Sequence, residues 1–197
     1  MTDPAASAAP AAPATGPRIA GFRRQLADLR PVDDAQDRLC REYLEFVASR
    51  GDSALDRDGG PEHVTASTFV FDAELRRILL TLHRKGRFWV QFGGHIEPGD
   101  VSVSAAAFRE AAEESGVDDL VPLSSEPLDL DRHALGAGFS CARHWDVGFA
   151  AVAPAAAVPA VSDESEDVRW WAVDELPEPL AGGFARRLGG ILRALRP

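Results

Sequence analysis

Cysteine is scarce in this sequence, which excludes a fold held together by disulfides. Cys40 and Cys141 are the two cysteines among 197 residues, and no CxxC pair occurs. A single distant pair is no disulfide framework for a chain of this length. We therefore predict that both are reduced thiols.

Long apolar runs and an excess of positive charge are also missing. No run approaches the ~18 residues that a membrane span needs, and the first 17 residues lack the basic start and apolar core of a signal peptide. Acidic residues number 31 against 21 Lys and Arg, a formal charge of -10. This balance argues against duplex nucleic acid and anionic membranes as partners. We predict a cytoplasmic protein, in which an anionic substrate would have to be attracted by local positive charge.

The sequence divides into a tail, a helical segment and one mixed domain. Residues 1–17 are mostly Ala and Pro and are predicted to be a disordered tail. Residues 18–60 form a predicted N-terminal helical segment that packs on the domain; Pro31 splits it, Asp33 or Asp34 caps the second helix and Gly51 ends it. Residues 61–197 form the predicted domain.

In the domain, the hydrophobic period changes to that of strands. Three strands are predicted in quick succession, in VTASTFVF, LRRILLTLH and RFWVQF, and three more in EPLDLDRH, RHWDVGFAAVA and VRWWAV. A helix is predicted from about Ser102 to Ser115, with Ser102 or Ser104 as N-cap and Gly116 as the residue after its end. The C-terminal residues place Phe184, Leu188, Ile191, Leu192 and Leu195 on one helical stripe. The fold class is therefore α/β.

The predicted helix that ends at Ser115 carries an unfavourable concentration of negative charge. Glu110, Glu113 and Glu114 are spaced i,i+3 and i,i+4, so all three carboxylates can converge on one side. They lie in the last two turns, where the helix dipole is already negative. A divalent cation would relieve this repulsion, and Mg²⁺ or Mn²⁺ prefers such oxygen ligands.

The loop before this helix suits the same purpose. Gly93, Gly94 and Gly99 allow sharp turns and leave backbone groups open to a ligand. The carbonyl of Gly93 or Gly94 is a candidate metal ligand, and Glu97 and Asp100 add two acids. Asp100 is equally well explained as a cap of the helix, because a side-chain oxygen there would accept from free N–H groups.

The segment from Gly94 to Val117 resembles the box of the Nudix hydrolases, G-x5-E-x7-R-E-U-x-E-E-x-G-U, where U is aliphatic. REAAEESGV, from Arg109 to Val117, matches the second half at every fixed position. The first half departs from the pattern: Asp100 stands where the family has Glu, and eight residues rather than seven separate it from Arg109. The extra residue is most simply placed around Val101.

The resemblance implies a fold, a reaction and a set of roles. The fold would be a Nudix-like α/β/α sandwich, a mixed sheet between helices with the box as loop–helix–loop, plus the N-terminal helical segment. The reaction would be hydrolysis of the diphosphate bond in a nucleoside diphosphate linked to another group X, with Mg²⁺ or Mn²⁺. By position, Glu110, Glu113 and Glu114 would bind the metal and Arg109 would orient a glutamate. Glu97 is a candidate general base, although the base can lie outside the box.

Other residues are weighed against ordinary structural roles. Arg84 and Lys85 could meet substrate phosphates or could form a solvated turn. His144 and Asp146 share one side of a strand and would contact substrate if that side faces the cleft. The five histidines show no HxxxH or HxH spacing, which argues against zinc. The four tryptophans are expected in the core, with one exposed ring able to stack on a nucleobase.

Two functions remain open at this point. The first is a metal-dependent diphosphohydrolase that acts on a small nucleotide or related diphosphate. The alternative is a nucleotide-binding or sensing module on the same fold with a weakened site, which Asp100 and the longer loop would favour. Monomer and homodimer are both open.

Overall fold

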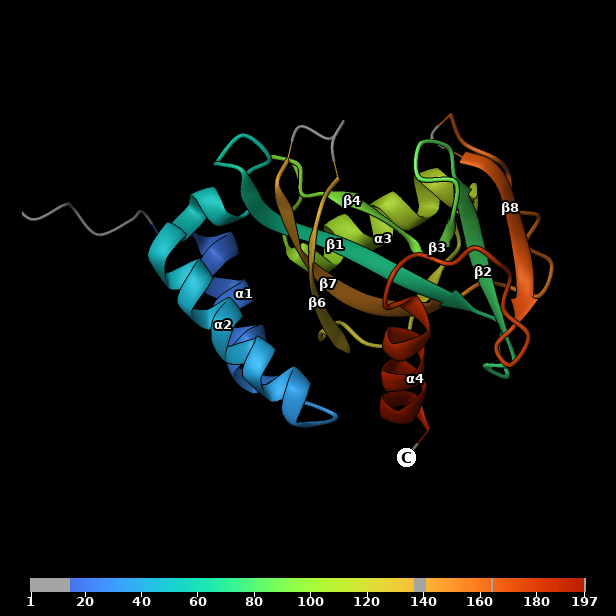
Figure 1. The fold of residues 1–197 in the computed structure, drawn as a ribbon, viewed down its shortest axis with the longest axis horizontal. Helices are drawn as coiled ribbons and strands as arrows, with labels where there is room; N and C mark the ends of the chain where they lie inside the picture. The colour runs from blue at the N-terminus through green and yellow to red at the C-terminus, as the bar shows by residue number, and fades with distance from the viewer. Residues whose placement is uncertain (1–14, 137–140, 164, 197) are drawn as a thin grey trace, which may run out of the picture.

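The structure is a computed structural model, and it describes residues 15–136, 141–163 and 165–196. Most of the predicted tail, residues 1–14, lies outside this range, and helix α1 (Pro17–Asp28) already begins at the last residue of that tail. Figure 1 shows the fold, with the N-terminal helices to one side of a sheet. Every helix among the described residues is too short or too polar to reach across a bilayer.

One eight-stranded mixed sheet forms the centre of the molecule. The order β3-β2-β1-β7-β5 runs through it, while β4 pairs with β1, β6 with β7 and β8 with β2. Strands β1 and β7 are parallel over their whole length, and the other pairs are antiparallel. The strands are β1 (Glu62–Phe71), β2 (Arg77–His83), β3 (Trp89–Val90), β4 (Phe92–His95), β5 (Val121–Pro122), β6 (Asp129–Ala134), β7 (Arg143–Val152) and β8 (Ser165–Ala172).

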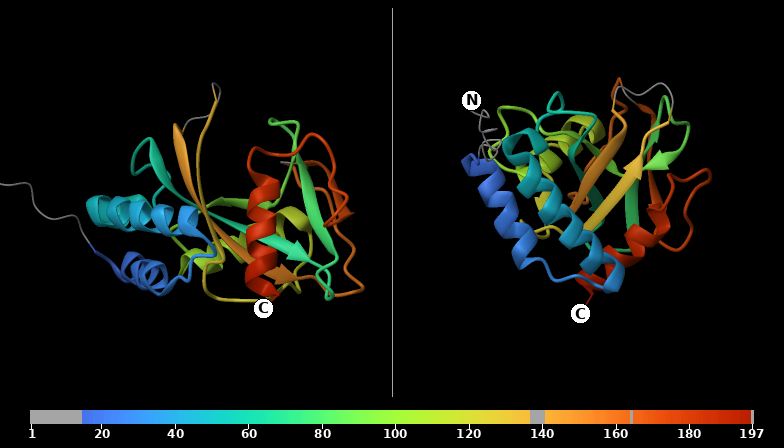
Figure 2. Two further views of the ribbon diagram at one scale, coloured as in Figure 1. Left: turned by 60° about the horizontal axis from the view of Figure 1, so that its bottom comes forward. Right: turned by 60° about the vertical axis from the view of Figure 1, so that its left-hand side comes forward.

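Helices cover both faces of this sheet, which confirms the predicted α/β/α architecture. Helix α3 (Val103–Ser115) packs behind β1 and β4 in Figure 1, and α4 (Phe184–Leu195) lies in front of the sheet, as both views of Figure 2 also show. Helix α2 (Asp34–Arg50) contacts β6 and is followed by the short 3₁₀ helix η1 (Gly51–Ala54).

Strand β1 supplies alternate residues to the two faces, as the period of a strand requires. Phe69 and Phe71 pack with Phe184 of α4, while Val70 packs with Ala111 of α3. The α4 stripe predicted from sequence is confirmed, because Phe184, Leu188 and Ile191 are buried and Leu192 and Leu195 pack partly buried against them. The two glycines inside α4 do not interrupt the helix.

The predicted ends of the second helix are also confirmed. The Asp33 side chain accepts from the N–H of Gln36, and Gly51 follows the helix with a positive φ of 58°. This helix carries the buried Tyr43, whose hydroxyl lies 2.7 Å from the carbonyl oxygens of Asp131 and Asp146. Helix α2 is therefore hydrogen-bonded to β6 and β7 through Tyr43.

Candidate active site

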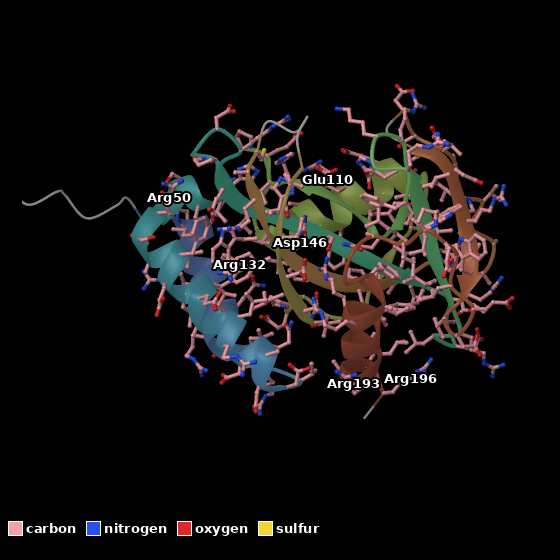
Figure 3. The ribbon with its side chains drawn as sticks, viewed as in Figure 1. Arg50, Glu110, Arg132, Asp146, Arg193 and Arg196 are labelled. Carbon is pink, nitrogen blue, oxygen red and sulfur yellow. The ribbon has the colours of Figure 1, made fainter. Side chains whose placement is uncertain are left out.

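Helix α3 ends where its sequence predicts. The Ser102 side chain accepts from the N–H of Ala105, and Gly116 follows the helix in the left-handed conformation with φ of 66°. Glu110, Glu113 and Glu114 therefore lie in the last two turns, at the negative end of the helix. Figure 3 shows Glu110 on α3, on the far side of β1 from the viewer.

Two glycines bring β4 against this end of α3. Gly93 has a φ of 157°, and a Cβ there would lie 2.5 Å from the carbonyl oxygen of Ala66 in β1. A Cβ on Gly94 would lie 2.6 Å from the carboxyl carbon of Glu110. The N–H of Gly93 donates to Glu114 over 3.0 Å. Because only glycine fits both places, the backbone of β4 and the acids of α3 can meet.

Arg109 collects the carboxylates of this region. Its Nε and Nη2 each donate to Asp100 over 3.0 Å, a paired contact that matches the planar guanidinium. Its Nη1 donates over 3.1 Å to both Glu110 and Glu113, and Nη2 also donates to the carbonyl oxygen of His95. The hydrogen bond and charge of Asp100 raise the pKa of Arg109 above its ordinary value.

Asp100 has a different structural role from a cap of α3, since the cap is Ser102. Its carboxylate is buried, holds Arg109 and accepts from the N–H of Glu97 over 2.7 Å. Burial alone would raise the pKa of Asp100, but the contacts with Arg109 and Glu97 outweigh it and the pKa is lowered. Val101, where the extra residue of the loop was placed, is exposed. The departure from the family pattern is thus accommodated at the surface, and the aspartate still reaches the arginine.

The residues of α3 suit a hard cation by chemistry, although their carboxylates are not drawn into a tight group. Glu113 is 61% exposed at its side chain and reaches toward Arg109, whereas Glu110 lies against Gly94 and Glu114 against Gly93. Carboxylate oxygens next to an open backbone are the donors that Mg²⁺ and Mn²⁺ take. Glu110, Glu114 and the Gly94 carbonyl are the candidate ligands, with Glu113 at the solvent side. Glu97 is exposed in the preceding loop, where its carbonyl accepts from Arg18.

A cavity of about 620 Å³ adjoins these residues. Its wall contains candidate site residues from segments that are far apart in the sequence. Among the residues that line it are Gly93, Gly94, Glu114, Arg84, Lys85, His144 and Asp146. Their roles in binding stay predictions, but their placement around one cavity is what those roles require.

Arg57 and Phe88 also line the cavity, although neither was predicted from the sequence as a site residue. Arg57 comes from the loop before β1, and Phe88 from the turn before β3. Phe88 stacks on His83 with ring centroids 5.7 Å apart. The aromatic ring in the wall is thus a phenylalanine rather than the tryptophan considered from sequence. A basic residue in a Gly-rich loop was the available signal for Arg57.

Asp146 is less available to a ligand than its position suggests. It is buried and receives hydrogen bonds from Thr65 over 2.9 Å and Ser67 over 2.6 Å. Arg187 of α4 donates to the same carboxylate over 2.7 Å and to Asp129 over 2.6 Å. Burial would raise the pKa of Asp146, but Arg187 and Ser67 lower it overall. Asp146, which Figure 3 labels near the middle of the sheet, is therefore a charged, already compensated group in the cavity floor.

Three imidazoles near the cavity have lowered pKa values. Burial is the main cause that lowers the pKa of His95 and of His144 to about 4, and neighbouring charges and imidazoles add to it. Burial also lowers the pKa of His63. The arginine and lysine side chains in the cavity wall are Arg57, Arg84 and Lys85, and they supply its permanent positive charge.

Comparison with known structures agrees with this architecture. A NUDIX-family hydrolase from Clostridium perfringens aligns with a TM-score of 0.52 and 23% identity, over 68% of this chain and 95% of that chain. An Ap4A hydrolase from C. elegans aligns with a TM-score of 0.55 and 16% identity, over 67% and 96%. The NUDIX domain of Shewanella oneidensis NrtR, in complex with ADP ribose, aligns with a TM-score of 0.54 and 18% identity, over 77% and 97%. These similarities establish the fold.

A sequence comparison supplies the family. A search among curated proteins gave no match. The family model of the NUDIX domain, however, matches residues 61–191, more than half of the chain. The acidic box from Gly94 to Val117 lies within this match. The chain therefore belongs to the Nudix superfamily of diphosphate-bond hydrolases.

Proposed function

We propose that this protein hydrolyses the diphosphate bond of a nucleoside diphosphate linked to another group X, with Mg²⁺ or Mn²⁺ as cofactor. The observation that carries the proposal is the composition of one cavity. Its wall combines the Gly93–Gly94 backbone and Glu114 with three basic side chains, Arg57, Arg84 and Lys85. A carboxylate that can bind a metal, next to basic side chains that can bind phosphate, suits a diphosphate substrate. The basic side chains also offset the repulsion that an anion would otherwise meet from the overall charge of -10.

Each part of the chain has a task in this proposal. Arg109 holds Glu110 and Glu113 in register at the end of α3. Arg84, fixed by its 3.0 Å hydrogen bond to the carbonyl oxygen of Ser165, and Lys85 bind the phosphates from the β2–β3 turn. A bound divalent cation would neutralise the phosphates and make a coordinated water more acidic. Glu97 and Glu113, the exposed carboxylates within the box segment, remain candidates to accept the proton of that water.

The descriptions of two similar structures support a nucleotide as substrate. One of those proteins is named for Ap4A, and the other is a complex with ADP ribose. Both are nucleosides whose phosphates form anhydride bonds. The His83–Phe88 pair offers this chain a ring on which a base could stack.

The test is a screen of nucleoside diphosphate derivatives with Mg²⁺ or Mn²⁺, in which product release is followed by chromatography. Glu113→Gln and Glu114→Gln should each lower kcat on the order of 10²–10⁴-fold. Both variants should keep or slightly raise the melting temperature, because a like-charge repulsion is removed. Glu126→Gln, at an exposed site outside the box, is the matched control and should leave kcat unchanged.

The competing function is a module that binds nucleotides without cleaving them. It was suggested by the longer loop and by Asp100, but the paired contact between Asp100 and Arg109 keeps the box arginine engaged. Binding of ADP ribose by calorimetry, with no product from any compound in the screen under either metal, would establish the module and refute the enzyme.

A further inference from the structure

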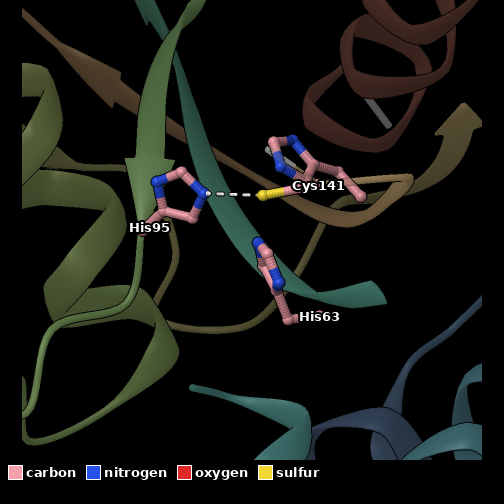
Figure 4. A group of neighbouring side chains, drawn as sticks. His63, His95 and Cys141 are labelled. Atoms are coloured by element: carbon pink, nitrogen blue, oxygen red, sulfur yellow. Dashed lines mark hydrogen bonds between the residues drawn. The ribbon is translucent and has the colours of Figure 1, made fainter. Parts of the chain in front are cut away.

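A second group of ligand-type side chains lies at the same cavity, and three of its four members, His95, His144 and Cys141, line the wall. His63, His95 and His144 come from β1, β4 and β7, and Cys141 lies two residues before β7. One nitrogen or sulfur atom from each of the four lies within 4.8 Å of all the others. Figure 4 shows His63, His95 and Cys141 turned toward a common centre. Among the described residues, it is the one group of three or more His, Cys, Asp or Glu side chains whose ligand atoms lie this close together.

Strand register explains why residues distant in sequence meet here. The parallel pairing of β1 with β7 places His63 beside His144, and the pairing of β1 with β4 places Thr65 beside His95. Positions 63 and 65 point to the same face of β1 because strand side chains alternate. The three rings accordingly have centroids 5.0 to 5.3 Å apart. HxxxH spacing is not needed to bring these side chains together, because the three histidines come from three different strands and Cys141 from the residues before β7.

The cluster contains buried polar atoms whose needs the protein does not meet. His63 is 0% exposed; the backbone of Gly60 approaches its ring, but neither ring nitrogen makes a hydrogen bond of normal geometry. The Nε2 atom of the half-buried His144 likewise makes none. Leaving such a group unsatisfied costs about 1–3 kcal/mol. A ligand between the rings would remove this cost at more than one residue.

We propose that His63, His95, His144 and Cys141 bind one transition-metal dication, with Zn²⁺ the expected ion. Imidazole and thiolate are the ligands that Zn²⁺ takes in four-coordinate sites, whereas Mg²⁺ and Mn²⁺ prefer oxygen. The inference needs no assumption about the reaction at α3.

The dimensions of the cluster fit a tetrahedral ion. Bonds of about 2.0 Å to nitrogen and 2.3 Å to sulfur place neighbouring ligand atoms roughly 3.3–3.5 Å apart. The Cys141 sulfur now lies 4.0 Å from Nε2 of His95. Small side-chain rotations suffice to close the group. Four protein ligands fill the coordination shell, so the site is structural: it ties the start of β7 to β1 and β4 and fixes this wall of the cavity.

The two cysteines provide a matched experiment. The full-length protein is loaded with Co²⁺ in the presence of excess Mg²⁺, and absorption by thiolate-to-cobalt charge transfer is recorded. The wild type and Cys40→Ser should show this band, because Cys40 donates to the Leu26 carbonyl far from the cluster; Cys141→Ser should lose it. A wild type without the band, or a band that survives in Cys141→Ser, would overturn the proposal.

A measurement on the wild type alone covers the case in which Cys141→Ser does not fold. Protein dialysed with Zn²⁺ should retain about one ion per chain by atomic emission. X-ray absorption should then find one sulfur and three nitrogen ligands around the ion. A shell of oxygen and nitrogen without sulfur, or less than a tenth of an ion per chain, would reject the site.

Discussion

Two arginines organise carboxylates in this protein, in opposite environments. Arg109 is 23% exposed at its side chain, and Asp100, Glu110 and Glu113, which it holds, all lie within nine residues of it in sequence. Arg187 is 4% exposed, and its partners Asp129 and Asp146 come from β6 and β7, more than forty residues away.

The carboxylates around Arg109 can therefore bind a ligand, whereas those around Arg187 stabilise the fold. Charges buried around Arg187 have lost their water, so each must keep its partner. Around Arg109, Asp100 is buried, but Glu110 and Glu113 remain 17% and 61% exposed at their side chains, and a change of partner for these two costs less. Arg187 also fixes α4 to the floor of the cavity, because it donates to Asp146, which receives the hydrogen bonds of Thr65 and Ser67 as well.

Removing Arg187 is the strongest test of this contrast. Arg187→Met should lower the free energy of unfolding by about 3–5 kcal/mol, because Asp129 and Asp146 are left as buried uncompensated charges. The measurement is urea denaturation at pH 7.

The neighbouring Arg186 is the control for that test. Its side chain is 56% exposed and contacts Asp131 over 2.7 Å. Arg186→Met should therefore cost no more than about 1 kcal/mol. Equal losses in the two variants would show that burial does not distinguish these ion pairs.

The same contrast explains what could be predicted from sequence. Signals that act within a few residues were sufficient for α2, α3 and α4 and for the longer strands. Asp33 and Ser102 start helices by local hydrogen bonding, and Gly116 ends one by its backbone conformation. The box, and therefore the family, is a contiguous segment. Arg109 and its acids could be read together for that reason.

Features assembled by strand pairing could not be predicted in this way. The parallel β1–β7 pair joins segments separated by about 70 residues of sequence, and it creates both the Asp146 floor and the histidine group. Arg187 did leave a signal, since it lies on the same helical stripe as Phe184, Leu188 and Ile191. A charged residue on an apolar stripe predicts a buried partner, but it does not identify Asp129 or Asp146.

A second prediction concerns Arg109 and an effect on rate rather than on folding. Arg109→Lys keeps the charge but loses the planar fork that grips Asp100, Glu110 and Glu113 together. Because carboxylates misplaced by about 1 Å can cost 10²-fold in rate, kcat should fall on the order of 10²-fold. The unfolding free energy should change by about 1 kcal/mol or less. If the variant loses several kcal/mol of stability while kcat is preserved in the folded fraction, Arg109 stabilises the fold and does not position the carboxylates for catalysis.

Asp131 gives the smallest effect and lies between the two regimes, because it is buried but pairs with the exposed Arg186 and with His133 over 2.9 Å. Burial would raise the pKa of Asp131, but the hydrogen bond to His133 and the charge of Arg187 lower it below its ordinary value. A lowered folded-state pKa stabilises the fold above about pH 4, the ordinary range of an aspartate, and this contribution is lost as the pH falls through the lowered value. Asp131→Asn should cost about 1–2 kcal/mol at pH 7, with the difference from wild type shrinking in urea titrations below pH 4. Asp119→Asn, at an exposed loop position, is the control and should change the free energy of unfolding by no more than about 0.5 kcal/mol. A pH-independent loss in Asp131→Asn would mean that packing, and not charge, carries the contribution of Asp131.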